Sequence, residues 1–231
     1  KNKFYFYGID KLDLSKRAIS IKLNPGIPSV LYNAMIHPLI PYTIKGAIWY
    51  QGEANVGRAE QYQRLFPAMI KDWRTQWNYD FPFYFVQIAP FQYHGNNDVS
   101  LDQSQKLREA QRHALKTKYT GMVVTLDIGN FNNIHPSNKQ DVGRRLARLA
   151  LANDYGKPIV PSGPLFKSLK VVEQKMILDF DYTGSGLMAK GDLLGFEIAG
   201  TDKNYVYANA KIVDNKIELS ASAISKPMYV R

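Results

Sequence analysis

Ile44–Asn55 reads IKGAIWYQGEAN, an apolar run that stops abruptly at polar and small residues. Ala47–Tyr50 shows no polar alternation, which predicts a strand buried on both faces of a mostly parallel sheet. Gln51–Asn55 follows directly. Ligands of open α/β sheets bind at the carboxyl ends of the strands, so the stretch predicts a ligand site at this end.

Two residues of the polar part have chemistry suited to such a site. Gly52 lets the backbone approach a ligand closely, because glycine carries no side chain. Asn55 follows three residues later and offers an amide NH₂ donor, which suits an oxyanion.

Two further apolar runs, Phe83–Ala89 and Gly121–Leu126, predict two more buried strands. Helical segments over Arg58–Trp77 and Leu101–Lys118 separate the three strands, and a helix over Asn138–Asp154 closes the unit. This alternation predicts a βαβ sheet with helices on both faces. Three strands make a thin sheet for a stable domain.

The third strand leads into Asp127–Pro136 (DIGNFNNIHP), at the same edge as Gln51–Asn55. His135 in this loop is a candidate general base, because an imidazole with a pKa of about 6.5 accepts a proton at neutral pH. A lone loop histidine is more often a structural hydrogen bonder; its place opposite Gly52 and Asn55, together with an HP-x-N-K-Q context that resembles the family named below, favours the base. His94, in the loop Phe91–Ser100 after the second strand, is a second candidate for a ligand contact.

The composition and the hydrophobic pattern of the sequence change from Lys157 and Pro158 onward. A Pro- and Gly-rich stretch there resembles a linker, and short alternating runs follow, separated by Gly, Asp and Asn. Asp214 and Asn215 predict a hairpin turn. We therefore predict two domains: a partial α/β domain over residues 1–157 and a small antiparallel β module over residues 158–231.

Composition narrows the class of protein. The chain has 231 residues, 45% hydrophobic and 13% aromatic, which supports a proper core. No window reaches the ~20 apolar residues of a membrane span. No secretory signal is visible, and because the chain opens with Lys1, we expect it to be part of a longer protein.

The chain has no cysteine, which excludes disulfides, thiolate nucleophiles and Cys-type zinc sites. Its four histidines are dispersed, so we expect no metal site and no cofactor. The formal charge of +10 raises the question of nucleic acid, but the basic residues are scattered among acidic ones and form no basic stripe. A cationic surface also favours anionic ligands such as acidic sugars.

One long block of the sequence resembles a known family. WYQGEANVGRAEQYQRLFPAMIKDWRTQW is similar to the central block of the sialate O-acetylesterases, a branch of the SGNH hydrolases that removes acetyl groups from sugars. Collinear matches run from about Ile27 to the C-terminus: PSVLYNAMIHPLIPYTIKG, NNIHPSNKQDVGRRLA and GSGLMAKGDLLGFEIAG.

The resemblance implies a fold and an activity. The fold would be an SGNH-type, flavodoxin-like three-layer α/β/α sheet, and the activity serine-histidine hydrolysis of acetyl esters on sugars, without a cofactor. His135 would be the catalytic histidine, and Gly52 with Asn55 would form the third family block, whose Asn donates to the oxyanion. Gln51 and Glu53 would shape the pocket or contact sugar hydroxyl groups.

The sequence departs from the family pattern beside the histidine. Many SGNH enzymes carry an Asp three residues before it, where this chain has Asn132, with Asn133 next to it. A neutral amide does not stabilise imidazolium as a carboxylate does. Either a Ser-His dyad operates with a backbone carbonyl or Asn orienting the ring, or Asp127 or Glu53 supplies the charge. Asn132 and Asn133 therefore count as pocket-shaping candidates.

The nucleophile is the largest gap. The family carries it in a G-Q-S-N type block after the first strand, and no serine of this chain has that context. Ser185 resembles a G-x-S-x-G elbow, but the first glycine is missing. We expect the serine and the first strand to lie in an N-terminal half outside this chain, which alone would be inactive. The sheet would then be incomplete at its N-terminal side.

Three other functions remain open. Within enzymes, an acetylxylan esterase is the nearest alternative. A noncatalytic carbohydrate-binding protein would use the same pocket and the β module. A basic nucleic-acid binder is the third alternative. The expected partners are an acetylated sugar and the missing half of the same protein, with no nucleic acid and no membrane. By resemblance we expect a periplasmic or extracellular location.

Overall fold

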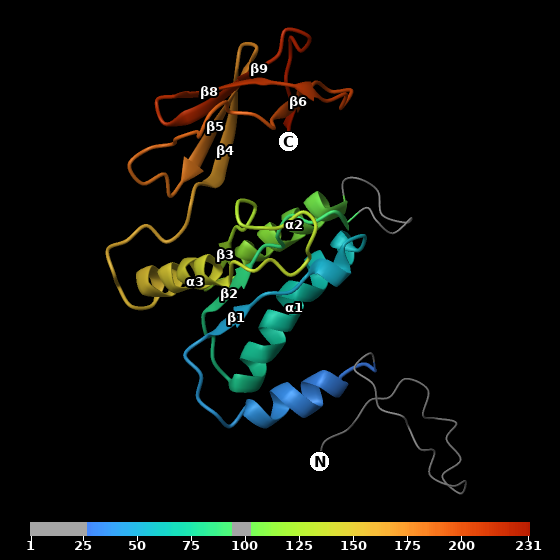
Figure 1. Ribbon diagram of the computed structural model, residues 1–231, viewed down its shortest axis with the longest axis vertical. Helices are drawn as coiled ribbons and strands as arrows, with labels where there is room; N and C mark the ends of the chain where they lie inside the picture. The colour runs from blue at the N-terminus through green and yellow to red at the C-terminus, as the bar shows by residue number, and fades with distance from the viewer. Residues whose placement is uncertain (1–26, 94–102) are drawn as a thin grey trace, which may run out of the picture. The chain divides into compact units, whose positions relative to one another are not determined.

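The computed structural model describes residues 27–93 and 103–231 (Figure 1). The aromatic run Lys3–Tyr7 and the alternating run Ile19–Leu23 predict two strands, and both lie outside these residues. The residues before Ile44 belong to a separate unit from Ile44–Arg231. In that first unit the sequence predicts a helix over Pro28–Ile40 that Pro38 ends or bends. The helix is irregular: a π-helix, η2 (Tyr32–Ile36), leads into a 3₁₀ helix, η3 (His37–Leu39). Proline in η3 explains the change, since it lacks the N–H that an α-helix needs.

The second unit contains a parallel sheet, as predicted. Its strands are β1 (Ala47–Trp49), β2 (Phe83–Val86) and β3 (Thr120–Val123), in the order β1-β2-β3. Both pairings are parallel, with Ala47 opposite Phe83 and Phe83 opposite Thr120. All three strands therefore end at one edge, which we call the carboxyl edge.

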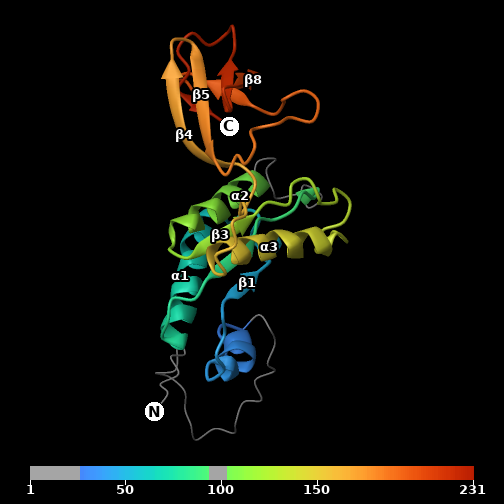
Figure 2. The same ribbon diagram turned by 90° about the vertical axis from the view of Figure 1, so that its left-hand side faces the viewer.

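Helices cover both faces of this sheet, so the domain has three layers (Figure 2). Helices α1 (Ala59–Trp77) and α2 (Gln103–His113) pack on one face, and α3 (Lys139–Asn153) packs on the other. The first interface joins Phe66 and Leu107 of the helices to Phe83 and Phe85 of the middle strand. The second joins the following residues: Tyr84, Val86 and Val123 of the strands with Val142, Leu146 and Leu149 of α3.

Helix α1 contains Pro67 and forms one element from Ala59 to Trp77, without a restart at the proline. An interior proline costs a helix about 3 kcal/mol. Aromatic packing offsets this cost, because Phe66 meets Phe85 and Phe83 edge to face, with ring centroids 5.0 and 6.0 Å apart. The helix ends at Asn78, which takes the left-handed conformation with φ 55°.

The prediction that β1 is buried on both faces is wrong for the described residues. Ile48 in the middle of β1 is 71% exposed. It lies on the face that α3 covers over Tyr84 and Val123, and no described helix extends over β1 there. Within the described residues, β1 pairs only with β2, so its second edge carries no strand.

The C-terminal part of the unit is antiparallel, as predicted. One sheet has the order β4-β5-β9-β8 and a smaller one β10-β6-β7. The strands are β4 (Leu165–Val172), β5 (Lys175–Asp181), β6 (Glu197–Ala199), β7 (Val206–Tyr207), β8 (Asn209–Val213), β9 (Lys216–Ser220) and β10 (Tyr229–Val230).

Met176, Ile198 and Leu219 form the fully buried centre of this region. The predicted hairpin turn joins β8 to β9 at Asp214 and Asn215, which both have positive φ, at 49° and 61°. The domain boundary at residue 157 stays a prediction.

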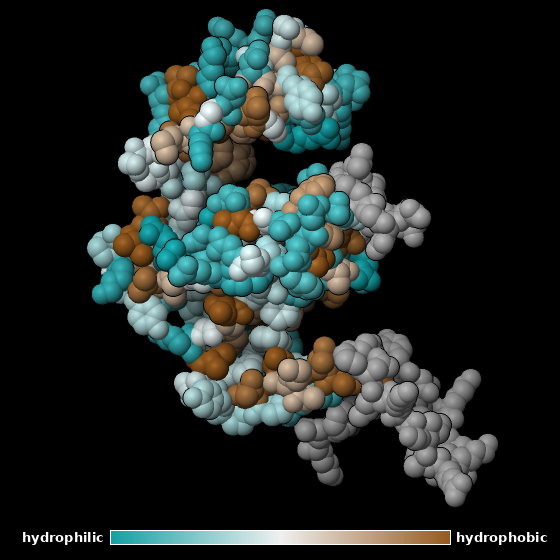
Figure 3. Space-filling model, in the orientation of Figure 1, coloured by the Kyte–Doolittle hydropathy of each residue, from teal (hydrophilic) through white to brown (hydrophobic). Residues whose placement is uncertain are grey.

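Two further properties concern the helices and the surface of the described residues. None of their helices has the length and apolar character to cross a membrane. Hydrophobic and hydrophilic side chains are interspersed on the face shown in Figure 3.

Candidate functional site

The carboxyl edge is held together by a buried glutamine on α2. Gln111 has no exposed surface, and its Nε2 donates to the carbonyl oxygens of Gln51 (3.2 Å) and Val86 (3.3 Å). Its Oε1 accepts from the backbone N–H of Ile88 (2.9 Å). One side chain therefore joins the ends of β1 and β2. A sequence signal existed, because Gln111 lies four residues after buried Leu107 on the apolar face of the helix.

Gly52 has little room beside this glutamine. A Cβ atom at Gly52 would lie 2.9 Å from Cγ2 of Ile88 and 3.0 Å from Nε2 of Gln111. Its φ of 154° is also one that side chains with a Cβ rarely adopt. Glycine is thus required here for packing at the edge, and its role in access by a ligand stays a prediction.

The Asn55 amide is oriented by Gln51. Asn55 ends a short 3₁₀ helix, η4 (Glu53–Asn55), and its Oδ1 accepts from Nε2 of Gln51 at 2.8 Å. Gln51 is held in turn through its carbonyl oxygen, which also accepts from the Tyr62 hydroxyl (3.2 Å). The Nδ2 group of Asn55 donates to no other group among the described residues. An NH₂ donor is therefore left available at the carboxyl edge.

Glu53 is half-buried beside tyrosines of this edge. Burial raises the pKa of the Tyr93 hydroxyl to about 12, and the negative charge of Glu53 adds to that rise. The pKa of Tyr50 is raised by the same two causes in the same order. The carboxylate thus lies at the edge, where the sequence predicted a pocket-shaping residue, and that role stays a prediction.

The loop that carries His135 is shaped by its own asparagines. Oδ1 of Asn130 accepts from the backbone N–H of Asn132, and Oδ1 of Asn133 accepts from that of His135, both at 2.9 Å. The next residue, Pro136, is buried. The His135 side chain is exposed and its ring has no hydrogen-bond partner among the described residues. Asn133 therefore acts on the backbone of His135 rather than on its ring.

The loops after the three strands meet one another. The backbone N–H of Gln92, after β2, donates to the carbonyl oxygen of Phe131, after β3 (3.0 Å). At the start of α3, Nζ of Lys139 lies 4.8 Å from the centroid of the Tyr50 ring, at the end of β1. The segments bearing Asn55 and His135 are thus brought to one edge. His94 lies outside the described residues.

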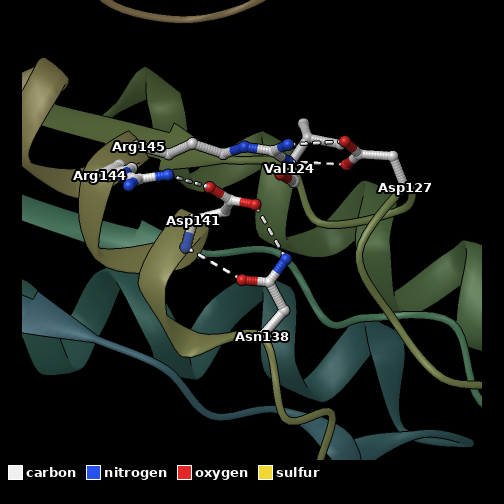
Figure 4. Close-up of polar contacts among 6 residues, drawn as sticks. All are labelled: Val124, Asp127, Asn138, Asp141, Arg144 and Arg145. Atoms are coloured by element: carbon white, nitrogen blue, oxygen red, sulfur yellow. Dashed lines mark hydrogen bonds and ion pairs between the residues drawn. The ribbon is translucent and has the colours of Figure 1, made fainter.

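Asp127 was one of two carboxylates considered as a partner of His135, and the structure pairs it with Arg145 instead. Its two oxygens accept from Nη1 and Nη2 of Arg145 at 2.7 and 2.6 Å (Figure 4). The guanidinium lowers the pKa of this carboxyl group. Arg145 therefore binds the loop inside the same domain while a third of its side chain stays exposed.

Two other sequence expectations concern reactive groups. Ser185 lies in a turn after β5 and not between a strand and a helix, so it has no nucleophile-elbow geometry. Across residues 27–93 and 103–231 there is no group of three or more His, Asp or Glu side chains placed to hold a metal ion.

These features define an α/β domain with an amide donor and a histidine loop at the carboxyl edge of a parallel sheet. The family model described as carbohydrate esterase, sialic acid-specific acetylesterase, matches residues 19–152. This match covers more than half of the chain, and the chain belongs to that family.

Curated relatives are named sialate O-acetylesterase. Sialate O-acetylesterase of Mus musculus is 35% identical over 188 residues, which are 74% of this chain and 35% of the relative. The Homo sapiens protein of that name is 34% identical over 192 residues, covering 76% of this chain and 37% of the relative. The chain thus spans about a third of the length of these relatives.

A solved structure supports the fold directly. The crystal structure of a carbohydrate acetylesterase from Xanthomonas citri is 42% identical, with a TM-score of 0.82. The match covers 88% of this chain and 48% of that chain.

Proposed function

We propose that this chain is the part of a carbohydrate O-acetylesterase that supplies the general base and an oxyanion donor. The observation that carries the proposal is the carboxyl edge, where Gln51 directs the Asn55 amide and where Lys139, four residues after His135, lies over the Tyr50 ring just after β1. The family match and the names of the relatives support the reaction class.

In the proposed reaction a serine outside this chain attacks the acetyl carbonyl carbon. His135 takes the serine proton, and Asn55 donates a hydrogen bond to the oxyanion. His135 then gives the proton to the departing sugar oxygen, which leaves an acetyl-serine. Water activated by His135 cleaves that ester and releases acetate, so that serine and imidazole return to their starting states.

The proposed fold is an SGNH-type three-layer sheet that a further strand completes at β1. Exposure of Ile48 supports this proposal, as does the second edge of β1, which has no strand among the described residues. The span of this chain, about half of the Xanthomonas citri structure, supports it too. The missing half of the same protein would carry the serine.

Asp127 pairs with Arg145, and this leaves Glu53 as the remaining carboxylate candidate for the charge partner of His135. The proposed mechanism works as a Ser-His pair, with the ring oriented by a backbone carbonyl, an amide or the carboxylate of Glu53. Of the two carboxylates considered, Glu53 is the one without an ion pair among the described residues.

The test compares the longer protein that contains this chain with the 231 residues alone. We expect the longer protein to hydrolyse p-nitrophenyl acetate and this chain to be inactive. Full activity of the chain alone would contradict the proposal. Assay of the longer protein on O-acetylated sialic acid and on acetylated xylan separates the two esterase types. We expect the acidic sugar to be preferred, because the chain carries a net charge of +10.

A further inference from the structure

Arg145 links helix α3 to the point where the His135 loop leaves the sheet. Its Nη1 donates to the carbonyl oxygen of Val124, just after β3, and to Oδ1 of Asp127, both at 2.7 Å. Its Nη2 donates to Oδ2 of Asp127 at 2.6 Å. Figure 4 shows the guanidinium lying along the carboxylate. The Arg145 side chain thus binds both Val124, directly after β3, and Asp127, in the first part of the loop.

The other end of the loop is fixed on the same helix. Asn138 caps α3: its Oδ1 accepts from the backbone N–H of Asp141 (3.1 Å), and its Nδ2 donates to Oδ2 of Asp141 (2.8 Å). His135 lies three residues before this cap. The loop therefore leaves β3 and enters α3 at two polar attachments, and both lie within two turns of one helix.

Apolar burial holds only part of the loop between these attachments: Ile128 packs on the cluster of β2, β3 and α3, and Pro136 is buried. Leu126 is 52% exposed and Phe131 is 61% exposed. The hydrogen bonds inside the loop join residues two or three apart and shape turns without tying them to the sheet. The contacts to the neighbouring loop are the hydrogen bond from Gln92 and the packing of Gly129 on Pro90. The loop thus packs on the sheet at Ile128, while polar contacts anchor its start at Arg145 and its end at Asn138.

We infer that Arg145 is a positioning residue for the reaction proposed above: it holds the loop so that the His135 ring stays at reacting distance. This inference rests on the proposed function of His135. Lysine cannot replace Arg145 fully, because an ammonium group cannot form two parallel hydrogen bonds to one carboxylate while also reaching a carbonyl oxygen.

The experiment uses the longer protein that contains this chain and compares Arg145→Ala with Arg145→Lys. Arg112→Ala is a matched control, because Arg112 also grips a carboxylate with two nitrogens, that of Glu109, at 2.7 and 2.5 Å. The two pairs are similarly exposed, with Arg112 at 37% and Arg145 at 33%. The Arg112 pair lies within α2, and no hydrogen bond or ion pair joins it to a loop of the carboxyl edge within residues 27–93 and 103–231.

Two readouts are taken. The first is hydrogen exchange of the amides over residues 124–136, which reports the anchoring without any need for activity. The second is kcat and KM on p-nitrophenyl acetate. For Arg145→Ala we expect faster exchange over these residues and kcat lower by about 10- to 100-fold, with KM changed by less than about threefold. Arg145→Lys should regain part of kcat, and Arg112→Ala should match the wild type.

Several outcomes would overturn the inference. Should Arg145→Ala fail to fold, Asp127→Asn takes its place with the same readouts, since Asp127 is 62% exposed and is expected to tolerate the change. Unchanged exchange overturns the anchoring. Faster exchange with unchanged kcat overturns the positioning role if His135→Ala is inactive. If His135→Ala is fully active, the proposed function itself has failed.

Discussion

Nζ of Lys139 lies 4.8 Å from the ring centroid of Tyr50, and this contact joins the two segments of the candidate site. Tyr50 directly precedes the Gln51–Asn55 segment, and Lys139 follows His135 by four residues. A cation over an aromatic ring contributes about 0.5–1 kcal/mol at an exposed site. Together with the buried Gln111, it keeps the loops of the carboxyl edge in contact.

The first prediction concerns the two groups proposed to act on the ester. In the longer protein, His135→Ala should lower kcat by about 10²- to 10⁴-fold because the general base is lost. Asn55→Ala should lower it by about 10²- to 10³-fold because an oxyanion donor is lost. Steady-state hydrolysis of p-nitrophenyl acetate measures both. His113→Ala is the control, since His113 binds Gln63 and Glu109 on the outer side of α2; equal losses in all three variants would argue against the assignment.

The second prediction concerns the orientation of Asn55. In Gln51→Glu the carboxylate has no N–H to donate to Oδ1 of Asn55, so it would accept from Nδ2 instead and occupy the proposed oxyanion donor. We expect kcat to fall by about tenfold or more. Gln61→Glu, on the exposed side of α1, gives the same charge change away from the site. The idea is refuted if Gln51→Glu and Gln61→Glu behave alike.

The third prediction concerns stability. Gln111→Leu keeps the buried volume but removes the acceptor of the Ile88 N–H and a donor to the carbonyl oxygens of Val86 and Gln51, of which Gln51 keeps its bond from Tyr62. Each unsatisfied buried group costs about 1–3 kcal/mol, so the free energy of unfolding should fall by about 2–5 kcal/mol in urea titrations. Gln105→Leu, at an exposed position of the same helix, should stay within about 0.5 kcal/mol of the wild type. A similar small loss in Gln111→Leu would show that the three bonds contribute little.

The fourth prediction tests whether β1 is covered in the longer protein. Ile48→Ser should change the stability of this chain by less than about 0.5 kcal/mol, because the side chain is 71% exposed. In the longer protein it should cost about 2–4 kcal/mol if a further element packs on it. Ile70→Ser, at a fully buried position, should destabilise both forms. Equal, small effects of Ile48→Ser in both forms would contradict the proposed completion of the sheet.

The fifth prediction concerns high pH. Tyr84 donates to Oδ2 of Asp154 at 2.8 Å, and burial together with this bond raises its pKa from 10.0 to about 12. The folded pKa lies above the unfolded one, so this stabilisation is complete below pH 10 and is lost as the pH rises toward 12. Denaturant titrations across that range should show a shallower loss in Tyr84→Phe than in the wild type. Identical curves would mean that Tyr84 ionises alike in both states.

The local features of the fold could be predicted from the sequence. The apolar runs at Phe83–Ala89 and Gly121–Leu126 indicated buried strands, and the structure has β2 and β3 there. Such runs mark buried strands because both faces of the strand pack against helices. The polar end at Gln51–Asn55 indicated the carboxyl edge, and parallel pairing brings the strand ends together. Period and composition suffice for such features.

The features that could not be predicted from the sequence depend on long-range contacts. Arg145 is one of several arginines in a helix of ordinary pattern, and nothing local shows that its partner lies 18 residues earlier. Gln111 bonds to Gln51 across 60 residues. Exposure of Ile48 depends on which elements cover the sheet, and a strand pattern does not encode this. Hydrogen bonds between distant segments thus set the details of the site.

The most direct measurement is a crystal structure of the longer protein after reaction with an organophosphate ester, which labels an active serine with a mimic of the tetrahedral intermediate. We expect the labelled serine to lie outside these 231 residues. Nδ2 of Asn55 should lie about 3 Å from the phosphoryl oxygen, and a ring nitrogen of His135 about 3 Å from the serine oxygen. A labelled serine with these two side chains on opposite ends of the sheet would contradict the account.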